Sequence, residues 1–189
     1  VGVACLDRDI DFTDGPACAR VARELELDVD GEGRLLSRGQ VVDMDGLLGE
    51  EPGAAASRVG QLPEVRQVLV AAQQRIGAHW DLVTEGRDTT TVVFPKAEYK
   101  FYLTASLEER ARRRHGQMGQ TQCEESLKDE IVLRDRMDQE RAASPLSLAE
   151  DACIVNTDGM SIAQVVEALY GRVQAAAAAL DPSQEHAGE

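Results

Sequence analysis

The chain has 189 residues, 43% of them hydrophobic, which is enough for one medium-sized domain or a core with a small inserted subdomain. Its formal net charge of −14 argues against a general binder of nucleic acid or anionic membranes. No apolar run approaches the ~20 residues of a membrane span, and no signal peptide is visible, so we expect a cytoplasmic protein. The four cysteines stand singly and indicate neither a zinc site nor a disulfide scaffold, so we expect thiols that are buried or have no chemical role.

The first half of the chain is expected to combine helices with a small antiparallel sheet. Residues 1–8 are typical of the end of an apolar helix, and residues 14–25 have helical spacing of apolar side chains. A connection rich in Gly and Ala over residues 46–60 leads to a helix over residues 64–75, which Pro63 opens. Short alternating runs separated by turn residues predict an antiparallel meander over residues 27–30, 34–36 and 40–42.

The second half alternates strands with helices. A short buried strand is expected to end at Thr84, and further strands are expected over residues 98–104 and 152–156. Capping boxes at Ser106 and Ser161 mark two helix starts. The helices are predicted over residues 106–115, 122–140 and 161–177. This alternation predicts an α/β chain whose parallel sheet is flanked by helices, with the meander as a separate lobe.

The stretch over residues 84–95, TEGRDTTTVVFP, is the strongest candidate for a ligand-binding loop. Two carboxylates and a guanidinium, from Glu85, Arg87 and Asp88, follow the predicted strand directly. In open α/β sheets, ligands bind at the carboxyl ends of strands. Gly86 is expected to allow a backbone turn that other residues cannot adopt.

A second candidate is the helix over residues 122–140. Its positions Leu127, Ile131, Arg134, Asp138 and Arg141 are spaced four, three, four and three apart, and therefore share one face. The apolar stripe becomes charged without leaving that face, which favours side chains that point into a cleft. The alternative is a solvated ladder of ion pairs within the helix, which contributes little to stability.

Four stretches resemble signature motifs of the bacterial cytidylate kinases, which phosphorylate CMP and dCMP. They are residues 85–95 (EGRD…TVVFP), residues 130–146 (EIxxRDxxDxxRxxxPL), residues 57–66 (SxVxxxPxVR) and residues 106–114 (SxEERAxRR). The resemblance implies the fold of the P-loop nucleoside monophosphate (NMP) kinases, a parallel sheet flanked by helices with a small β-rich NMP-binding lobe and a helical lid. The lobe would cover residues 27–75 and the lid about residues 110–141, and residues 1–26 and 76–189 would form the core plus lid.

The resemblance also implies roles for individual residues. On the acceptor side, Asp138 would hydrogen-bond the cytosine edge and Asp88 the sugar hydroxyls, while Ser57 would contact the base and Arg66 the base or the phosphate. Phosphate groups would be held by Arg87, Arg134 and Arg141, with Arg134 at the transferring γ-phosphoryl group. Arg110 and Arg113 would meet the ATP phosphates or the adenine, and Glu85 would lie near Mg²⁺ through water.

Several of these residues have a simpler structural interpretation when the resemblance is set aside. Ser57 is then a helix cap, Arg66 a solvated helix residue, and the charged run after Ser106 a solvated helix face.

Kinases of this class need the Gly-rich loop GxxxxGK[ST], whose amides and Lys hold the ATP phosphates. No GK[ST] occurs in the sequence. We therefore expect a cytidylate kinase chain that is truncated at its N-terminus and inactive as it stands. The alternative is a non-catalytic CMP-binding relative without a P-loop. Either way, we expect a monomer that has no nucleic-acid or membrane partner, and whose family uses ATP, CMP or dCMP, and Mg²⁺.

Overall fold

The computed structural model describes residues 1–117, 123–140 and 146–180. Its contacts divide the chain into two compact units, and each is described by itself. The first comprises Val1–Pro95 and Glu140–Leu146, and the second Lys96–Gln139 and Ser147–Glu189. The expected lobe over 27–75 and lid over 110–141 stay predictions. No helix in the described ranges is both long and apolar enough to cross a membrane.

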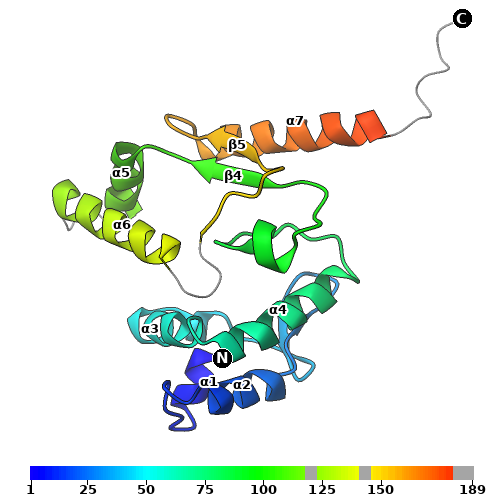
Figure 1. Cartoon of the computed structure of the whole chain (residues 1–189), viewed down its shortest axis with the longest axis vertical. Coiled ribbons are helices and arrows are strands. Elements are labelled where there is room, and N and C mark those ends of the chain that lie inside the picture. Colours follow the sequence, from blue (N-terminus) through cyan, green and yellow to red (C-terminus); the bar gives the residue numbers. More distant parts are fainter. Residues whose placement is uncertain (118–122, 141–145, 181–189) are drawn as a thin grey trace, which may run out of the picture. The chain divides into compact units, whose positions relative to one another are not determined.

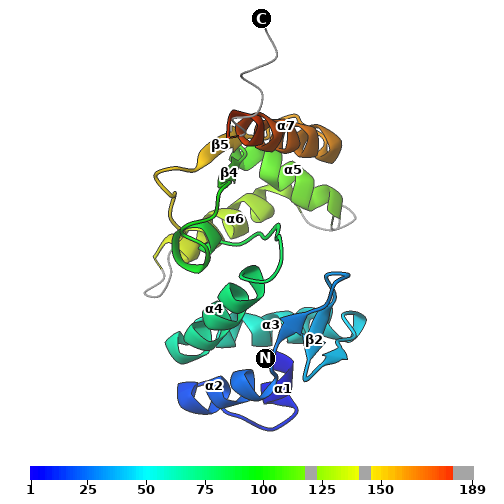
Figure 2. The ribbon, with the colours of Figure 1, turned by 90° about the vertical axis from the view of Figure 1, so that its right-hand side faces the viewer.

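The first unit is helical, with one small sheet (Figure 1). Helix α2 packs against α4, and α1 packs against α3, as Figure 2 also shows. The predicted meander is confirmed as the antiparallel sheet β1-β2-β3. The elements are α1 Gly2–Leu6, α2 Gly15–Glu24, β1 Asp28–Val29, β2 Leu35–Ser37, β3 Gln40–Val41, η1 Asp45–Leu47, α3 Glu50–Val59, α4 Pro63–Gly77 and the π-helical turn η2 Thr89–Val93.

The core of this unit follows from the apolar faces of α2 and α4. Asp14 caps α2, since its carboxylate accepts a hydrogen bond from the Ala17 amide at 2.9 Å. Pro63 occupies the first turn of α4, where no amide hydrogen is needed. Buried side chains of four elements then meet in one cluster, which consists of Cys5, Cys18, Ala19, Val21, Ala22, Val59 and Val65.

Two expectations for this unit were wrong. The region over residues 46–60 forms η1 and α3 rather than mainly a connection, because Pro52 lies in the first turn of α3, where proline is tolerated. The buried strand expected to end at Thr84 is absent, and Val83 is fully exposed. The strands described in the first unit pair only with one another, so the residues before Thr84 have no strand there to which they could hydrogen-bond.

The second unit holds the parallel strands that the sequence predicts, β4 Phe101–Thr104 and β5 Cys153–Asn156. Figure 1 shows them side by side, with α7 Ile162–Leu180 running along the pair. Arg172 of α7 donates a hydrogen bond to Sγ of Cys153. Helices α5 Leu107–Gln117 and α6 Glu124–Gln139 pack against each other. The prediction of an α/β chain with parallel strands is thus confirmed.

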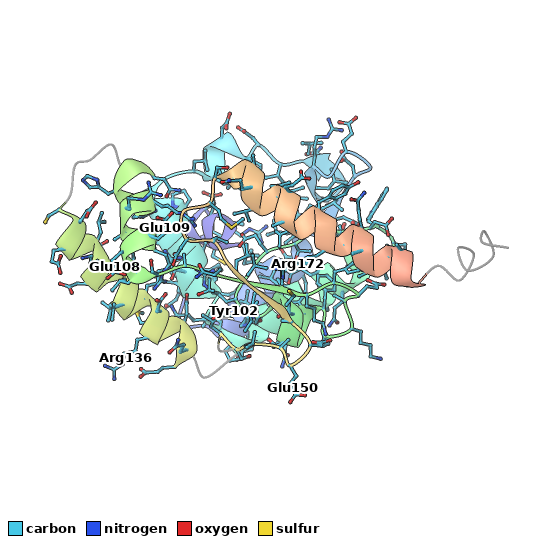
Figure 3. The ribbon with its side chains drawn as sticks, turned by 90° about the horizontal axis from the view of Figure 1, so that it is seen from above. Tyr102, Glu108, Glu109, Arg136, Glu150 and Arg172 are labelled. Atoms are coloured by element: carbon cyan, nitrogen blue, oxygen red, sulfur yellow. The ribbon has the colours of Figure 1, made fainter. Side chains whose placement is uncertain are left out.

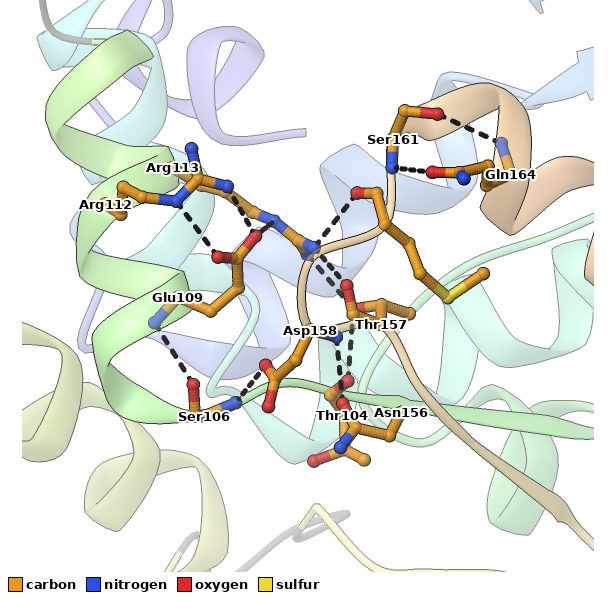
Figure 4. Close-up of polar contacts among 11 residues, drawn as sticks. Thr104, Ser106, Glu109, Arg112, Arg113, Asn156, Thr157, Asp158, Ser161 and Gln164 are labelled. Atoms are coloured by element: carbon orange, nitrogen blue, oxygen red, sulfur yellow. Dashed lines mark hydrogen bonds and ion pairs between the residues drawn. The ribbon is translucent and has the colours of Figure 1, made fainter.

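A network of hydrogen bonds ties the loops after β4 and β5 together (Figure 4). The Ser106 amide donates to Asp158 at 2.7 Å, and Thr157 Oγ1 donates to the Thr104 carbonyl at 3.1 Å. Arg113 of α5 donates to Thr157 Oγ1 at 3.0 Å, and also to the Thr157 carbonyl. The start of α5 is therefore fixed to the turn that precedes α7.

The two predicted capping boxes have different outcomes. At α7 the box is complete, because Ser161 and Gln164 each accept a hydrogen bond from the other's amide, at 3.3 and 2.8 Å. At α5 only the serine half forms, with the Glu109 amide donating to Ser106 Oγ at 3.2 Å. The Glu109 carboxylate instead binds Arg112 and Arg113, which holds the pKa of Glu109 below its ordinary value of 4.5, chiefly through the hydrogen bond from Arg112.

The contact between α1 and α3 predicts a steric requirement at Gly2. A Cβ at this position would lie 2.6 Å from the Ala55 carbonyl carbon, so Gly2→Ala should lower the free energy of unfolding by ~1–3 kcal/mol. Gly53 is the matched control, because a Cβ there meets nothing within 4 Å; Gly53→Ala should raise it by ~0.5–1 kcal/mol. Urea unfolding measures both. Equal effects would contradict the close α1–α3 contact.

The Glu109 contacts predict a pH-dependent contribution to stability. Because the folded-state pKa is lowered, the contribution is present above the unfolded-state value and is lost as pH falls through the folded-state value. The difference in melting temperature between the wild type and Glu109→Gln should therefore be greatest near neutral pH and shrink below pH ~4.

Glu108→Gln is the matched control for this measurement. Glu108 lies in the same first turn of α5, is exposed, and forms no ion pair with any residue in the described ranges (Figure 3). Its substitution should leave the pH profile close to that of the wild type. A Glu109→Gln profile parallel to the wild-type profile would show that the ion pairs contribute nothing.

Candidate active site: a pocket and an arginine-rich helix pair

The loop with the sequence EGRD leads from exposed, irregular backbone into η2. The amides of Val92 and Val93 donate to the Asp88 carbonyl at 2.8 and 3.2 Å, which fixes the backbone of Asp88. Gly86 does not adopt a left-handed conformation, so the expectation for its backbone was wrong. Glycine is favoured there because a Cβ would lie 2.9 Å from Cγ2 of Thr89.

Arg66 and Asp88 form an ion pair across the first unit. Arg66 extends from the second turn of α4 and donates to Oδ2 of Asp88, and their side chains are only 19% and 12% exposed. Arg66 also reaches the Gly60 carbonyl at 3.5 Å. The interpretation of Arg66 as a solvated helix residue is therefore wrong, and two predicted site residues that are 22 positions apart are brought together.

Arg66 and Asp88 both line a pocket of about 330 Å³. Its wall is mostly apolar, and Glu85 lies at it together with Arg66 and Asp88. Pockets for small ligands have this character, with apolar walls and a few polar groups that fix orientation. The lining residues are Leu27, Leu35, Gly60, Arg66, Leu69, Val70, Ala72, Gln73, Ile76, Glu85, Gly86, Asp88, Thr89 and Val93.

The other predicted residues of this unit lie outside the lining. Ser57 is exposed on α3, and its carbonyl accepts a hydrogen bond from Gln61 at 3.1 Å. Arg87 is exposed in the loop. Leu27, Leu35 and Gln73 also line the pocket, but sequence reasoning missed them. Residues of these types are common in sheets and on helix faces, so nothing in their sequence marks a binding role.

In the second unit, Arg110 joins α5 to α6. Its guanidinium donates to both carboxylate oxygens of Asp135, at 2.9 and 2.6 Å. This two-point hydrogen bonding raises the pKa of Arg110. Its Nε is buried without a hydrogen-bond partner among the residues described here. Sequence reasoning missed Asp135, although it lies inside the RDRMD run.

Arg113 likewise has internal partners. Besides Thr157, its guanidinium contacts Glu109 at 2.7 Å and the Met160 carbonyl at 3.4 Å (Figure 4). The interpretation of the charged run at the start of α5 as a solvated helix face is therefore wrong for Arg110 and Arg113. Nothing in the sequence marks Thr157 or Met160 as partners, because 44 or more positions separate them from Arg113.

Only some of the side chains predicted to share the inward face of helix α6 are buried. Leu127 is fully buried, and Asp138 is 3% exposed although it carries a carboxylate. Arg134 is exposed and forms no ion pair with any described residue, so the Arg134–Asp138 step of the alternative, an ion-pair ladder, is absent. Arg141 lies outside the described residues.

Comparison with known proteins identifies the family. The model of the cytidylate kinase family matches residues 1–175. The chain is 37% identical over 172 residues to a cytidylate kinase of Caldanaerobacter subterraneus subsp. tengcongensis, covering 89% of this chain and 76% of that protein. It is 38% identical to those of Exiguobacterium sibiricum (89% and 78% covered) and Methylococcus capsulatus (92% and 80% covered). The chain therefore belongs to the cytidylate kinases, a family of phosphotransferases.

Proposed function

We propose that the pocket of the first unit binds the base of CMP or dCMP as phosphoryl acceptor. The observation that carries this proposal is the Arg66–Asp88 pair at an otherwise mostly apolar wall. A flat ring packs well against apolar side chains such as Leu69, Ile76 and Val93, whereas a phosphate or a sugar does not. The resemblance implied a sugar contact for Asp88; its place beside Arg66 favours the base edge.

The chemistry of the pair matches cytosine. The base carries an amino group that donates, next to a ring nitrogen and a carbonyl that accept. A carboxylate such as Asp88 only accepts and a guanidinium such as Arg66 only donates, so together they complement that edge. Uracil presents a carbonyl where cytosine has its amino group. This carbonyl oxygen would face the carboxylate oxygens of Asp88, and two acceptors cannot form a hydrogen bond with each other. The pair should therefore select cytosine over uracil.

The remaining acceptor-side residues are proposed on the resemblance together with their chemistry. Ser57 and Asp138 are further contacts to CMP, and the burial of the Asp138 carboxylate suits a hydrogen-bonding role. Arg87, Arg134 and Arg141 are candidates to hold phosphate groups. Phosphoryl transfer depends mostly on positioning and charge neutralisation, to which guanidinium groups are suited. Arg134 has a charge that no described ion pair offsets.

On the donor side we propose Arg110 and Arg113 for ATP. Each would exchange an internal partner, Asp135 or Thr157, for a phosphate oxygen. Glu85 is the residue that would approach Mg²⁺, which supplies charge neutralisation between phosphates when bound. A single exposed carboxylate fits a cation that keeps most of its waters, and no cluster of three metal-binding side chains occurs in the described ranges.

These 189 residues contain no GxxxxGK[ST] motif. We propose that a polypeptide of these residues alone binds CMP without transferring a phosphoryl group, because the loop amides and Lys that hold the ATP phosphates are not in it. A coupled assay that detected CDP formation by this polypeptide would overturn this part of the proposal. We further propose a cytoplasmic monomer, with residues 27–75 as the acceptor lobe and about 110–141 as the lid.

Calorimetric titration with CMP, dCMP, UMP and AMP tests base recognition. Asp88→Asn should weaken CMP binding about tenfold to a hundredfold, as expected for a lost hydrogen bond to a charged group worth ~1.5–3 kcal/mol. Because the new amide can donate to the uracil carbonyl, the CMP:UMP preference should shift towards UMP. Asp138→Ala, measured alongside, decides whether Asp138 contacts the ligand.

The control variant is Asp81→Asn, which changes an exposed carboxylate in the same irregular segment. It should bind all four nucleotides as the wild type does. If Asp88→Asn weakened CMP and UMP equally, Asp88 would not read the base. Unchanged CMP binding by Asp138→Ala would remove Asp138 from the substrate site.

A further inference from the structure

The loop that carries Asp88 begins and ends at the same place on helix α4. A Cβ added to Gly77, the last residue of α4, would lie 2.6 Å from Cε1 of Phe94 and 3.5 Å from Cδ1 of Leu82. These two side chains stand at the two ends of residues 82–94, so both ends of the segment meet over one glycine. Loops whose ends lie close together in this way are compact and frequently functional.

A hydrogen bond adds a second attachment between this loop and α4. The side-chain amide of Gln74 donates to the Val93 carbonyl at 3.0 Å. Val93 is the last residue of η2, and its side chain is buried. Gln74 lies three positions before Gly77, so the hydrogen bond and the ring contact are neighbours on the surface of α4.

The π-helical turn η2 needs such attachments. It has five residues, and a single turn of helix is not stable by itself, because the entropy cost of ordering its backbone exceeds the contribution of its few hydrogen bonds. Asp88 in turn is fixed by η2, because the amides of Val92 and Val93 donate to its carbonyl. A chain of contacts therefore leads from α4 through η2 to the carboxylate that pairs with Arg66.

We propose that Gln74 and Gly77 are positioning residues for base selection, because they hold η2 on α4 and thereby keep the Asp88 carboxylate beside Arg66. The inference rests on the proposed function, in which Asp88 accepts a hydrogen bond from the amino group of cytosine. Arg66, Gln74 and Gly77 all belong to α4, so both members of the ion pair are positioned from the same helix. A site held by one rigid element presents its polar groups at fixed places.

Loss of this positioning should change the selectivity between nucleotides and not only the affinity. A displaced Asp88 would no longer accept from the cytosine amino group, which weakens CMP binding, whereas UMP has no such amino group. A purely structural role would act differently, because a smaller folded fraction lowers the apparent affinity for CMP and UMP by the same factor. The ratio of the two affinities therefore separates positioning from stability.

Gln74→Met tests the hydrogen bond, because it removes the donor and nearly preserves the length and helix propensity of the side chain. Calorimetric titration of the full 189-residue chain should give a CMP:UMP affinity ratio about threefold to tenfold below that of the wild type, the range for one neutral hydrogen bond. Gln74→Lys restores a donor and should recover most of the ratio. Gln67→Met is the matched control and should leave the ratio unchanged, because Gln67 is exposed on the same helix and outside the pocket lining.

Gly77→Ala tests the ring contact in the same assay. The new Cβ would displace the Phe94 ring, so the CMP:UMP ratio should fall as it does for Gln74→Met. Phe94→Leu, added to Gly77→Ala, removes the two nearest ring atoms, Cε1 and Cζ, so the double variant should recover part of the ratio. A double variant no better than Gly77→Ala would contradict the role of the ring contact.

Amide hydrogen exchange without nucleotide measures the attachment of η2 by itself. In Gln74→Met, the amides of Val92 and Val93 should exchange about threefold to tenfold faster than in Gln67→Met, because their hydrogen bonds to Asp88 open more often. Unchanged exchange would overturn the proposal, and so would an unchanged CMP:UMP ratio in Gln74→Met if Asp88→Asn shifts that ratio. If Asp88→Asn also left the ratio unchanged, the proposed function itself would fail, whereas faster exchange would still show that Gln74 holds η2.

Discussion

The candidate site depends on the ion pair between Arg66 and Asp88. Both side chains are largely removed from solvent, at a mostly apolar pocket wall. Removing Arg66 would take away the cation that hydrogen-bonds the largely buried carboxylate of Asp88, which is unfavourable. An Arg–Asp pair in such a place presents donors and acceptors to any flat polar ring that enters. In the proposed site, the stability of the fold and the selection of the base would therefore depend on the same two residues.

The rest of the first unit positions these two residues. Pro63 sets the start of α4, and the buried Val65 fixes its rotation, so that Arg66 extends to the pocket from the next position. The amides of η2 hold the Asp88 backbone from the other side. The pocket wall then comes from the sheet and the exposed half of α4. In the second unit, the hydrogen bonds of Arg113 have a similar positioning role, because they fix α5 to the turn before α7.

Local signals in the sequence predicted much of this architecture. The complete capping box at Ser161, the meander and the parallel strands were all visible as patterns of spacing. The failures concern what long-range contacts decide. Trp80–Thr84 has the composition of a strand. A strand forms only beside another strand to which it can hydrogen-bond, and the composition of a segment does not show whether such a neighbour exists. Glu109 fits a capping box, but two arginines compete for its carboxylate.

The candidate site residues were marked one by one in the sequence, but their geometry was not. The sequence marked Arg66 and Asp88 separately, and only the fold shows that they form one pair. Spacing likewise hid the shared burial of Cys5 and Cys18, which join one core cluster only when α1 and α2 pack together. Arg110 and Arg113 were marked as cations for a nucleotide, whereas their partners Asp135 and Thr157 carried no signal of their own.

The central claim is that the base of CMP enters the pocket beside Arg66 and Asp88. Methyl-resolved NMR titration with CMP tests it directly, because the ring current of a bound base shifts nearby methyl resonances. We expect the methyl groups of Leu69, Ile76 and Val93 to shift with CMP, and those of Leu103 and Ile154, on β4 and β5, to change little. Shifts confined to β4 and β5, with the pocket methyl groups unmoved, would contradict the account.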